Sequence, residues 1–245
     1  MLINVFSPAW FLMFGIDVVL IVVLSIWLRK KTVDQKGRIM TIIGVANCVI
    51  WVVYKFLLSR DPRFDFVLAL ELPLQLCNLN MILLVIALNI RKTGLLNFCF
   101  CFGIIGAFLS LMSPDPEFLG ITMLNYNRIG YWITHHLLFV QSILLVSSGF
   151  YRPRYKEVYK SIIILLILYF GMFFVNLILR KTTGIPVNYL YTFGMPGNTI
   201  IEMLYKLIPV YPIYLLPALI AVTPLLYGFV ALGRLGRECP DSVHS

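Results

Sequence analysis

Long apolar runs recur along this chain and leave few alternatives for its fold. Each run, at about 20 residues, is long enough to cross a hydrocarbon core of about 30 Å as an α-helix. The runs are continuous and do not alternate between apolar and polar residues, which disfavours membrane strands. We identify seven runs, at residues 10–28, 39–58, 67–90, 94–112, 129–149, 160–179 and 211–233. The sequence therefore predicts an all-α, polytopic integral membrane bundle of seven transmembrane helices.

The composition agrees with a chain that lies mostly in lipid. Hydrophobic residues make up 60% and charged residues 13% of the sequence, against roughly half and a quarter in soluble domains. The connections between runs are short, so we expect a single membrane domain over residues 1–245, without a separate soluble domain. The excess of basic residues lies in membrane-flanking loops, which predicts membrane topology and no nucleic-acid partner.

The distribution of basic residues predicts the orientation of the bundle. Of the 20 Lys and Arg residues, 7 lie in or beside the connections after the second, fourth and sixth runs. The other 13 lie in or beside the alternate connections and in the C-terminal tail. Because cytoplasmic loops carry more Lys and Arg, we expect the N-terminus outside and the C-terminus in the cytoplasm.

Two of the expected outer loops have an unusual composition. Residues 113–128 and 180–210 are rich in Gly, Pro, Asn and Tyr. Such a density indicates ordered loops or short interfacial helices that could cover a cavity. Asp115 and Arg128 flank the first loop, where they could form an ion pair or support a site at the outer boundary.

The third run contains the stretch "ELPLQLCNLN" at residues 71–80, whose polar residues are costly at membrane depth. Such residues usually face the interior of a bundle or water, and they often mark a functional site. If the run is one helix, Glu71, Gln75 and Asn78 share a face, while Cys77 and Asn80 lie together on another. The proline within the stretch is expected to kink this helix.

The fifth run supplies two adjacent histidines in "WITHH". His135 shares a helix face with Tyr131, whereas His136 shares one with Trp132 and Phe139, as in a packing or lipid-facing stripe. His135 is therefore the better candidate for chemistry. At about 1.5 Å of rise per residue, it lies with Cys77 in the outer half of the bilayer.

A thiol and a histidine together suggest acyl transfer. A thiolate is a nucleophile, and a nearby imidazole can accept the proton of the thiol. Gln75, Asn78 or Asn80 could orient the imidazole or donate to a tetrahedral oxyanion. The structural alternative is that Cys77 only fills space and that the carboxamides only bind helix to helix. No metal or organic cofactor is needed for this chemistry.

Several motifs, in order along the chain, resemble the YwaF-like integral membrane proteins. They are "LPLQLC", "GAFLSLMSPD", "WITHH", "YRPRY", "NYLYTFGMPGN" and "YPIYLLPAL", within residues 65–230. This family is similar to animal membrane proteins described as phospholipid acyltransferases with a cysteine and a histidine, and more distantly to lipid ester hydrolases. The resemblance implies Cys77 as nucleophile and His135 as base, with His136 left open as the base. It also implies a bacterial plasma membrane as the location.

The sequence thus favours a membrane-embedded lipid acyltransferase or lipid hydrolase acting on a membrane phospholipid or lyso-lipid. An alternative is a transporter or channel with a polar path through Glu71, Gln75, Asn78 and His135. A third hypothesis is a seven-helix receptor or scaffold whose polar residues are structural. Sequence periodicity alone does not decide whether the third and fifth runs touch.

Overall fold

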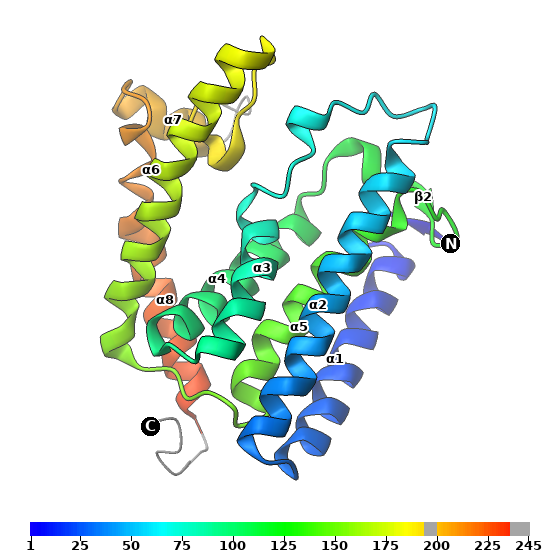
Figure 1. Ribbon diagram of the computed structural model, residues 1–245, viewed down its shortest axis with the longest axis vertical. Coiled ribbons are helices and arrows are strands. Elements are labelled where there is room, and N and C mark those ends of the chain that lie inside the picture. The colour runs from blue at the N-terminus through cyan, green and yellow to red at the C-terminus, as the bar shows by residue number, and fades with distance from the viewer. Residues whose placement is uncertain (194–199, 236–245) are drawn as a thin grey trace.

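The computed structural model describes residues 1–193 and 200–235, and these residues are mostly helical (Figure 1). The α-helices of the described residues are α1 (Pro8–Arg29), α2 (Val33–Leu58), α3 (Leu76–Ile90), α4 (Thr93–Met112), α5 (Ile129–Ser147), α6 (Val158–Thr183), α7 (Ile200–Leu207) and α8 (Ala218–Arg234). Short 3₁₀ helices are η1 (Leu68–Leu70), η2 (Pro116–Phe118), η3 (Tyr155–Glu157), η4 (Tyr189–Tyr191) and η5 (Ile213–Leu215). Two short strands, β1 (Leu2–Ile3) and β2 (Ile121–Thr122), complete the elements.

Five helical segments of the described residues are long and apolar enough to cross a membrane. They are α1, α2, α4, α5 and the segment Tyr155–Thr183, which contains α6. The two remaining predicted runs form shorter apolar helices, α3 with 15 residues and α8 with 17. The prediction of a helical membrane protein is confirmed at this level.

The third predicted run is not one continuous helix. Helix α3 begins only at Leu76, with Gln75 in an extended conformation at its N-cap (φ −72°, ψ 153°). Pro73 lacks a backbone N–H and disfavours the helical conformation of the residue before it. The prediction that Glu71, Gln75 and Asn78 share a helix face is therefore wrong, because residues 71–75 do not belong to a helix.

Helix α5 lies at the centre of the bundle, between α1 and α2 on one side and α4 on the other (Figure 1). Within its apolar segment 72% of the residues are buried, against 22% in α1 and in α2. The exposed faces of α1 and α2 carry mainly Val, Leu, Ile and Phe side chains. Such faces fit contact with lipid acyl chains, whereas α5 can hold polar side chains away from lipid.

The N-terminus and the connections after α2, α4 and α6 lie at one end of the bundle (Figure 1). There β1 pairs antiparallel with β2, with Leu2 opposite Thr122 and Ile3 opposite Ile121. The described parts of the two unusual loops contain η2, β2, η4 and α7. The expectation of ordered loops is confirmed for these parts, while residues 194–199 of the second loop lie outside the described residues.

Candidate active site

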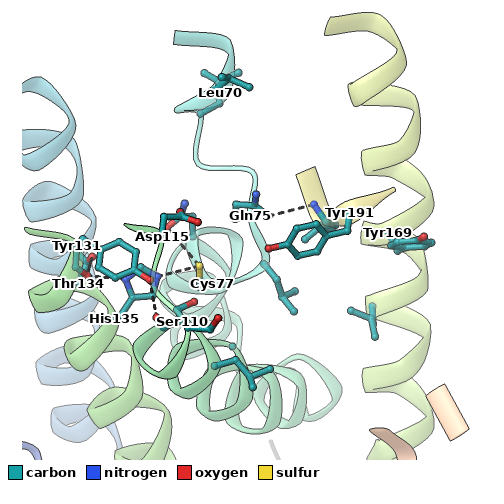
Figure 2. Close-up of a pocket in the computed structure, with 18 of the residues that line it drawn as sticks. Leu70, Gln75, Cys77, Ser110, Asp115, Tyr131, Thr134, His135, Tyr169 and Tyr191 are labelled. Atoms are coloured by element: carbon teal, nitrogen blue, oxygen red, sulfur yellow. Dashed lines mark hydrogen bonds between the residues drawn. The ribbon is translucent and has the colours of Figure 1, made fainter. Parts of the chain in front are cut away.

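A cavity of about 580 Å³ lies among α2, α3, α4, α5, α6 and α8. Its wall includes side chains from the irregular segment before α3 and from η4 (Figure 2). Cys77 and His135 both line it. A volume in this range can accept a sizeable part of a small organic ligand or lipid.

The structure brings Cys77 and His135 together. The Cys77 sulfur lies 3.2 Å from Nε2 of His135, across the contact between α3 and α5 (Figure 2). His135 Nδ1 lies 2.7 Å from the carbonyl oxygen of Tyr131, one turn earlier in α5. Since a carbonyl oxygen can only accept, Nδ1 carries a proton, and the lone pair of Nε2 faces the thiol. The pair is therefore arranged for transfer of the thiol proton to the imidazole.

The start of α3 places Cys77 in the first turn of a helix. The first helical hydrogen bond runs from the N–H of Leu79 to the carbonyl of Gln75, at 2.9 Å. The N–H groups before Leu79 have no carbonyl one turn earlier to bind, and the helix dipole is positive at this end. Both features favour negative charge near Cys77, as at many reactive cysteines. Sequence reasoning missed this position because it extended the helix through residues 71–75.

Polar groups of α4 and of the next residue in α3 also lie close to the sulfur. The Ser110 hydroxyl and the backbone N–H of Asn78 lie within hydrogen-bonding reach of Cys77. The Asn78 side-chain oxygen is 3.9 Å from the sulfur. The carbonyl of Ser110 accepts a hydrogen bond from the Tyr131 hydroxyl at 2.7 Å, which links α4 to the turn that orients His135.

Charged side chains gather on one side of the cavity. Lys55 of α2 forms an ion pair with Glu71, and Asp115 lines the same cavity. Desolvation, followed by the nearby carboxylate of Glu71, raises the pKa of Asp115, whereas Lys55 acts in the opposite direction. The walls contributed by α6, η5 and α8 are mainly leucine, with Tyr169, Ala218 and Val222. The cavity is thus polar and charged on one side and apolar on the other.

The remaining predicted residues have different surroundings. Gln75 lines the cavity, and its Oε1 accepts a hydrogen bond from the N–H of Leu190 at 3.3 Å. Asn80 is fully buried, and it is not among the residues that line the cavity. It is therefore not placed to contact a substrate there.

His136 lies away from the cavity. Its Nδ1 is 2.5 Å from Oδ2 of Asp17 in α1, and both side chains are buried. The His136 ring also packs edge-on against Phe14, with 5.0 Å between ring centroids. This residue ties α1 to α5, and it is not placed to accept a proton from Cys77. Sequence reasoning missed Asp17, although a lone carboxylate within an apolar run is a visible signal.

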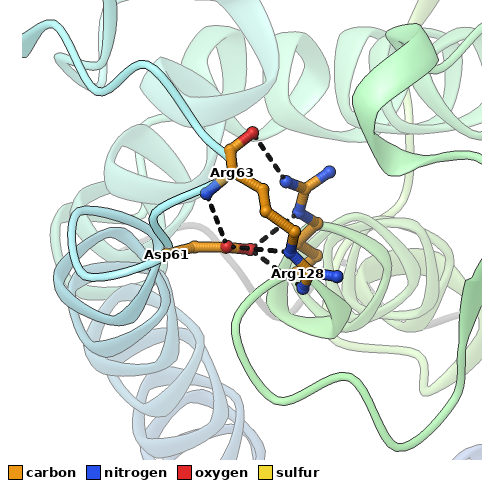
Figure 3. Close-up of polar contacts among 3 residues, drawn as sticks. All are labelled: Asp61, Arg63 and Arg128. Carbon is orange, nitrogen blue, oxygen red and sulfur yellow. Dashed lines mark hydrogen bonds and ion pairs between the residues drawn. The ribbon is translucent and has the colours of Figure 1, made fainter.

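The sequence suggested an ion pair between Arg128 and Asp115, but the structure pairs Arg128 with a different carboxylate. Its Nε lies 3.1 Å from Oδ2 of Asp61, in the connection after α2 (Figure 3). Asp61 also accepts hydrogen bonds from the backbone N–H of Arg63 at 3.0 Å and from its Nε at 3.2 Å. The side chain of Asp61 is only 1% exposed. This cluster fastens the connection after α2 to the start of α5, and so supports one end of the cavity.

We expect Asp61→Asn to lower the melting temperature at neutral pH by roughly 2–4 °C or more in a protein of this size. Arg63, with Arg128, lowers the pKa of Asp61 to about 2. A depressed pKa gives stability that is present above the unfolded value of about 4 and lost as the pH falls towards 2. The difference between wild type and variant should therefore shrink over this acidic range in thermal unfolding in detergent.

The matched control for this change is Asp34→Asn. Asp34 pairs with Arg91 at the opposite end of the bundle, but its side chain is 73% exposed. Exposed pairs contribute about 0–1 kcal/mol, so this variant should melt close to wild type. Equal effects of the two substitutions would contradict a special role for the buried Asp61 cluster.

Comparison with known proteins gives one finding. The model of the TMEM164 family matches residues 5–230, a range that contains every residue lining the cavity. Among curated proteins and solved structures, no match is found.

Proposed function

The chain belongs to the TMEM164 family of membrane proteins, and from this premise we propose that it is a membrane-embedded lipid acyltransferase or lipid ester hydrolase. In this proposal Cys77 is the nucleophile and His135 is the base. The observation that carries it is the 3.2 Å contact between the Cys77 sulfur and His135 Nε2 inside a cavity. The bond from His135 Nδ1 to Tyr131 supports the role of base, because it leaves Nε2 free to accept a proton.

The proposed reaction proceeds through a thioester. His135 Nε2 takes the thiol proton while the sulfur adds to the carbonyl carbon of a lipid ester, and the carbonyl electron pair moves onto oxygen. When this pair returns, the bond from the acyl carbon to the alcohol oxygen breaks, and the alcohol takes the proton from His135. A lyso-lipid hydroxyl or water then attacks the thioester, with His135 again moving the proton. Attack by a lyso-lipid completes acyl transfer, and attack by water completes hydrolysis.

The lining of the cavity supports a lipid as substrate. A phospholipid or lyso-lipid has a charged headgroup and an apolar chain joined near the ester. The charged side of the cavity, with Lys55, Glu71 and Asp115, can face a headgroup, and the side formed by α6 and α8 can face a chain. Cys77 lines the same cavity, in contact with His135.

The membrane arrangement is part of the same proposal. We propose that α3 and α8 complete seven spans of a single membrane domain, with the N-terminus outside and the C-terminus in the cytoplasm. The grouping of the N-terminus with the connections after α2, α4 and α6 at one end supports the arrangement of spans (Figure 1). The excess of Lys and Arg in the other connections supports the orientation. The relationship to YwaF-like proteins and the location in a bacterial plasma membrane rest on the sequence motifs.

The proposal predicts an acyl-enzyme on Cys77. Purified protein incubated with a phospholipid carrying a labelled acyl chain should become labelled on Cys77, and neutral hydroxylamine should release the label, as expected of a thioester. The matched control is Cys48→Ala, which removes a half-buried thiol of α2 that is not among the cavity-lining residues. That variant should still be labelled.

Absence of label on Cys77 in folded wild-type protein, measured by peptide mass spectrometry, would contradict the proposal. Solute flux through proteoliposomes that depends on Glu71 and survives loss of Cys77 would instead favour the transport alternative.

A further inference from the structure

The segment at η4 has an unusual backbone beside the cavity. Leu190 and Tyr191 have φ angles of 54° and 53°, in the left-handed region that few residues other than glycine adopt. Both side chains line the cavity. Such strain persists only where surrounding contacts enforce it, and it is often found at functional sites.

Side-chain hydrogen bonds hold this segment in place. Asn176 of α6 donates to the carbonyl of Tyr189 at 2.8 Å and to the Thr192 hydroxyl at 2.7 Å, and accepts from the N–H of Tyr189 at 3.0 Å. The Tyr189 hydroxyl donates to the carbonyl of Ala69 at 2.8 Å and accepts from the N–H of Leu72 at 3.0 Å. The segment is therefore fixed both to α6 and to the chain that leads into α3.

Two further contacts fix Tyr191 relative to the nucleophile. The Tyr214 hydroxyl donates to the carbonyl of Tyr191. The Gln75 side chain accepts a hydrogen bond from the N–H of Leu190 at 3.3 Å, and Gln75 is the N-cap of the helix that carries Cys77. The strained segment and the start of α3 are thus held in one arrangement.

The result of this arrangement is a tyrosine hydroxyl directed into the cavity. In Figure 2 the ring of Tyr191 lies beside Gln75, with its hydroxyl towards Cys77. Two other cavity tyrosines use their hydroxyls elsewhere: Tyr131 donates to the carbonyl of Ser110, and Tyr169 to that of Pro212. The Tyr191 hydroxyl has no such bond to a described residue.

We propose that the Tyr191 hydroxyl donates a hydrogen bond to the ester oxygen that becomes negative when Cys77 adds to the acyl carbon. Tyr191 is then a catalytic residue, because it touches a reacting atom. The inference rests on the proposed function. When the sulfur–carbon bond forms, the carbonyl electron pair moves onto this oxygen, and the hydroxyl stabilises it without giving up its proton. When the pair returns, the bond to the alcohol breaks.

The surroundings of the hydroxyl suit a donor. Burial, followed by Asp115 and Cys77, raises the pKa of Tyr191 above its ordinary value. The phenol therefore stays protonated at neutral pH. A backbone N–H in the first turn of α3 can supply a second donor to the same oxygen.

The test compares Tyr191→Phe with the wild-type protein in mixed micelles of phospholipid and detergent. The substitution removes only the hydroxyl, so we expect kcat to fall by roughly 10²–10³-fold, with KM and melting temperature close to wild type. Tyr191→Gln retains a donor and should recover part of the lost rate. The matched control is Tyr155→Phe, the same change on an exposed tyrosine at the start of η3, which should keep wild-type turnover.

A thiono ester, with sulfur in place of the carbonyl oxygen, separates a catalytic from a structural role. A purely structural effect of Tyr191 would slow the thiono ester and the oxygen ester equally. Sulfur accepts hydrogen bonds poorly, so wild type should prefer the oxygen ester, and Tyr191→Phe should lose much of that preference. If the wild-type protein forms the acyl-enzyme and the Tyr191→Phe variant keeps the same kcat, the role of Tyr191 is overturned but the proposed function stands. A wild type that forms no acyl-enzyme would overturn the proposed function and this inference with it.

Discussion

Replacing Cys77 with alanine is expected to reduce lipid acyl transfer or hydrolysis by about 10³-fold or more, to the uncatalysed background. Without the sulfur no thioester can form, and the His135 imidazole alone offers only general-base help to water. Turnover of a labelled phospholipid, with a lyso-lipid acceptor present or absent, measures both reactions. The melting temperature of the variant shows whether the fold is retained.

The two adjacent histidines provide an internal comparison. His135→Gln should lower kcat by roughly 10²–10⁴-fold, the usual contribution of a general base. It should also slow alkylation of Cys77 by a small maleimide, because Nε2 is then missing from its place 3.2 Å from the sulfur. His136→Gln loses the partner of Asp17 and should mainly lower the melting temperature.

Two results would contradict the assignment of Cys77 as nucleophile and His135 as base. Full turnover in a folded Cys77→Ala protein would remove the thioester mechanism. A larger loss of kcat in His136→Gln than in His135→Gln would move the base to a side chain that is not among the cavity-lining residues. Either result would require a different chemical role for the Cys77–His135 contact.

The helices were predictable because their cause is local. A continuous apolar run of sufficient length must satisfy its own backbone in lipid, and only a helix does so within one segment. The third run departed from this rule because Pro73 disfavours a helix at this point, and Glu71 and Gln75 on either side of it line the cavity. Because the run was treated as one helix, Glu71 and Gln75 were assigned to a helix face that does not exist. For the same reason Cys77 was not recognised as a residue of the first helical turn.

Contacts between helices were harder to predict, because they depend on how distant segments pack. The sequence indicated that Cys77 and His135 could meet, and the structure puts them in contact. The partner of His136 proved to be Asp17, which is 119 residues away in the chain. A strained backbone such as that of Tyr191 leaves no sequence signal beyond a loop rich in Asn and Tyr.

Gly130→Ala is expected to be the most damaging single methyl addition at the contact between α2 and α5. A Cβ at Gly130 would lie 2.3 Å from Cβ and 2.5 Å from Cγ of Tyr54. These distances are well inside van der Waals contact, and the Tyr54 Cβ cannot rotate away because it is bonded directly to the backbone. The helices must therefore separate, at a cost of about 1–3 kcal/mol or more.

Thermal unfolding in detergent measures this effect, since each kcal/mol shifts the melting temperature by roughly 2–4 °C in a protein of this size. The matched control is Gly171→Ala in α6, where an added Cβ meets nothing within 4 Å. There alanine should be neutral or stabilise the helix by about 0.5–1 kcal/mol. A Gly130→Ala protein that melts like wild type would contradict the close approach of α2 and α5. Because Tyr54 also lines the cavity, the same variant should lose turnover as the two helices move apart.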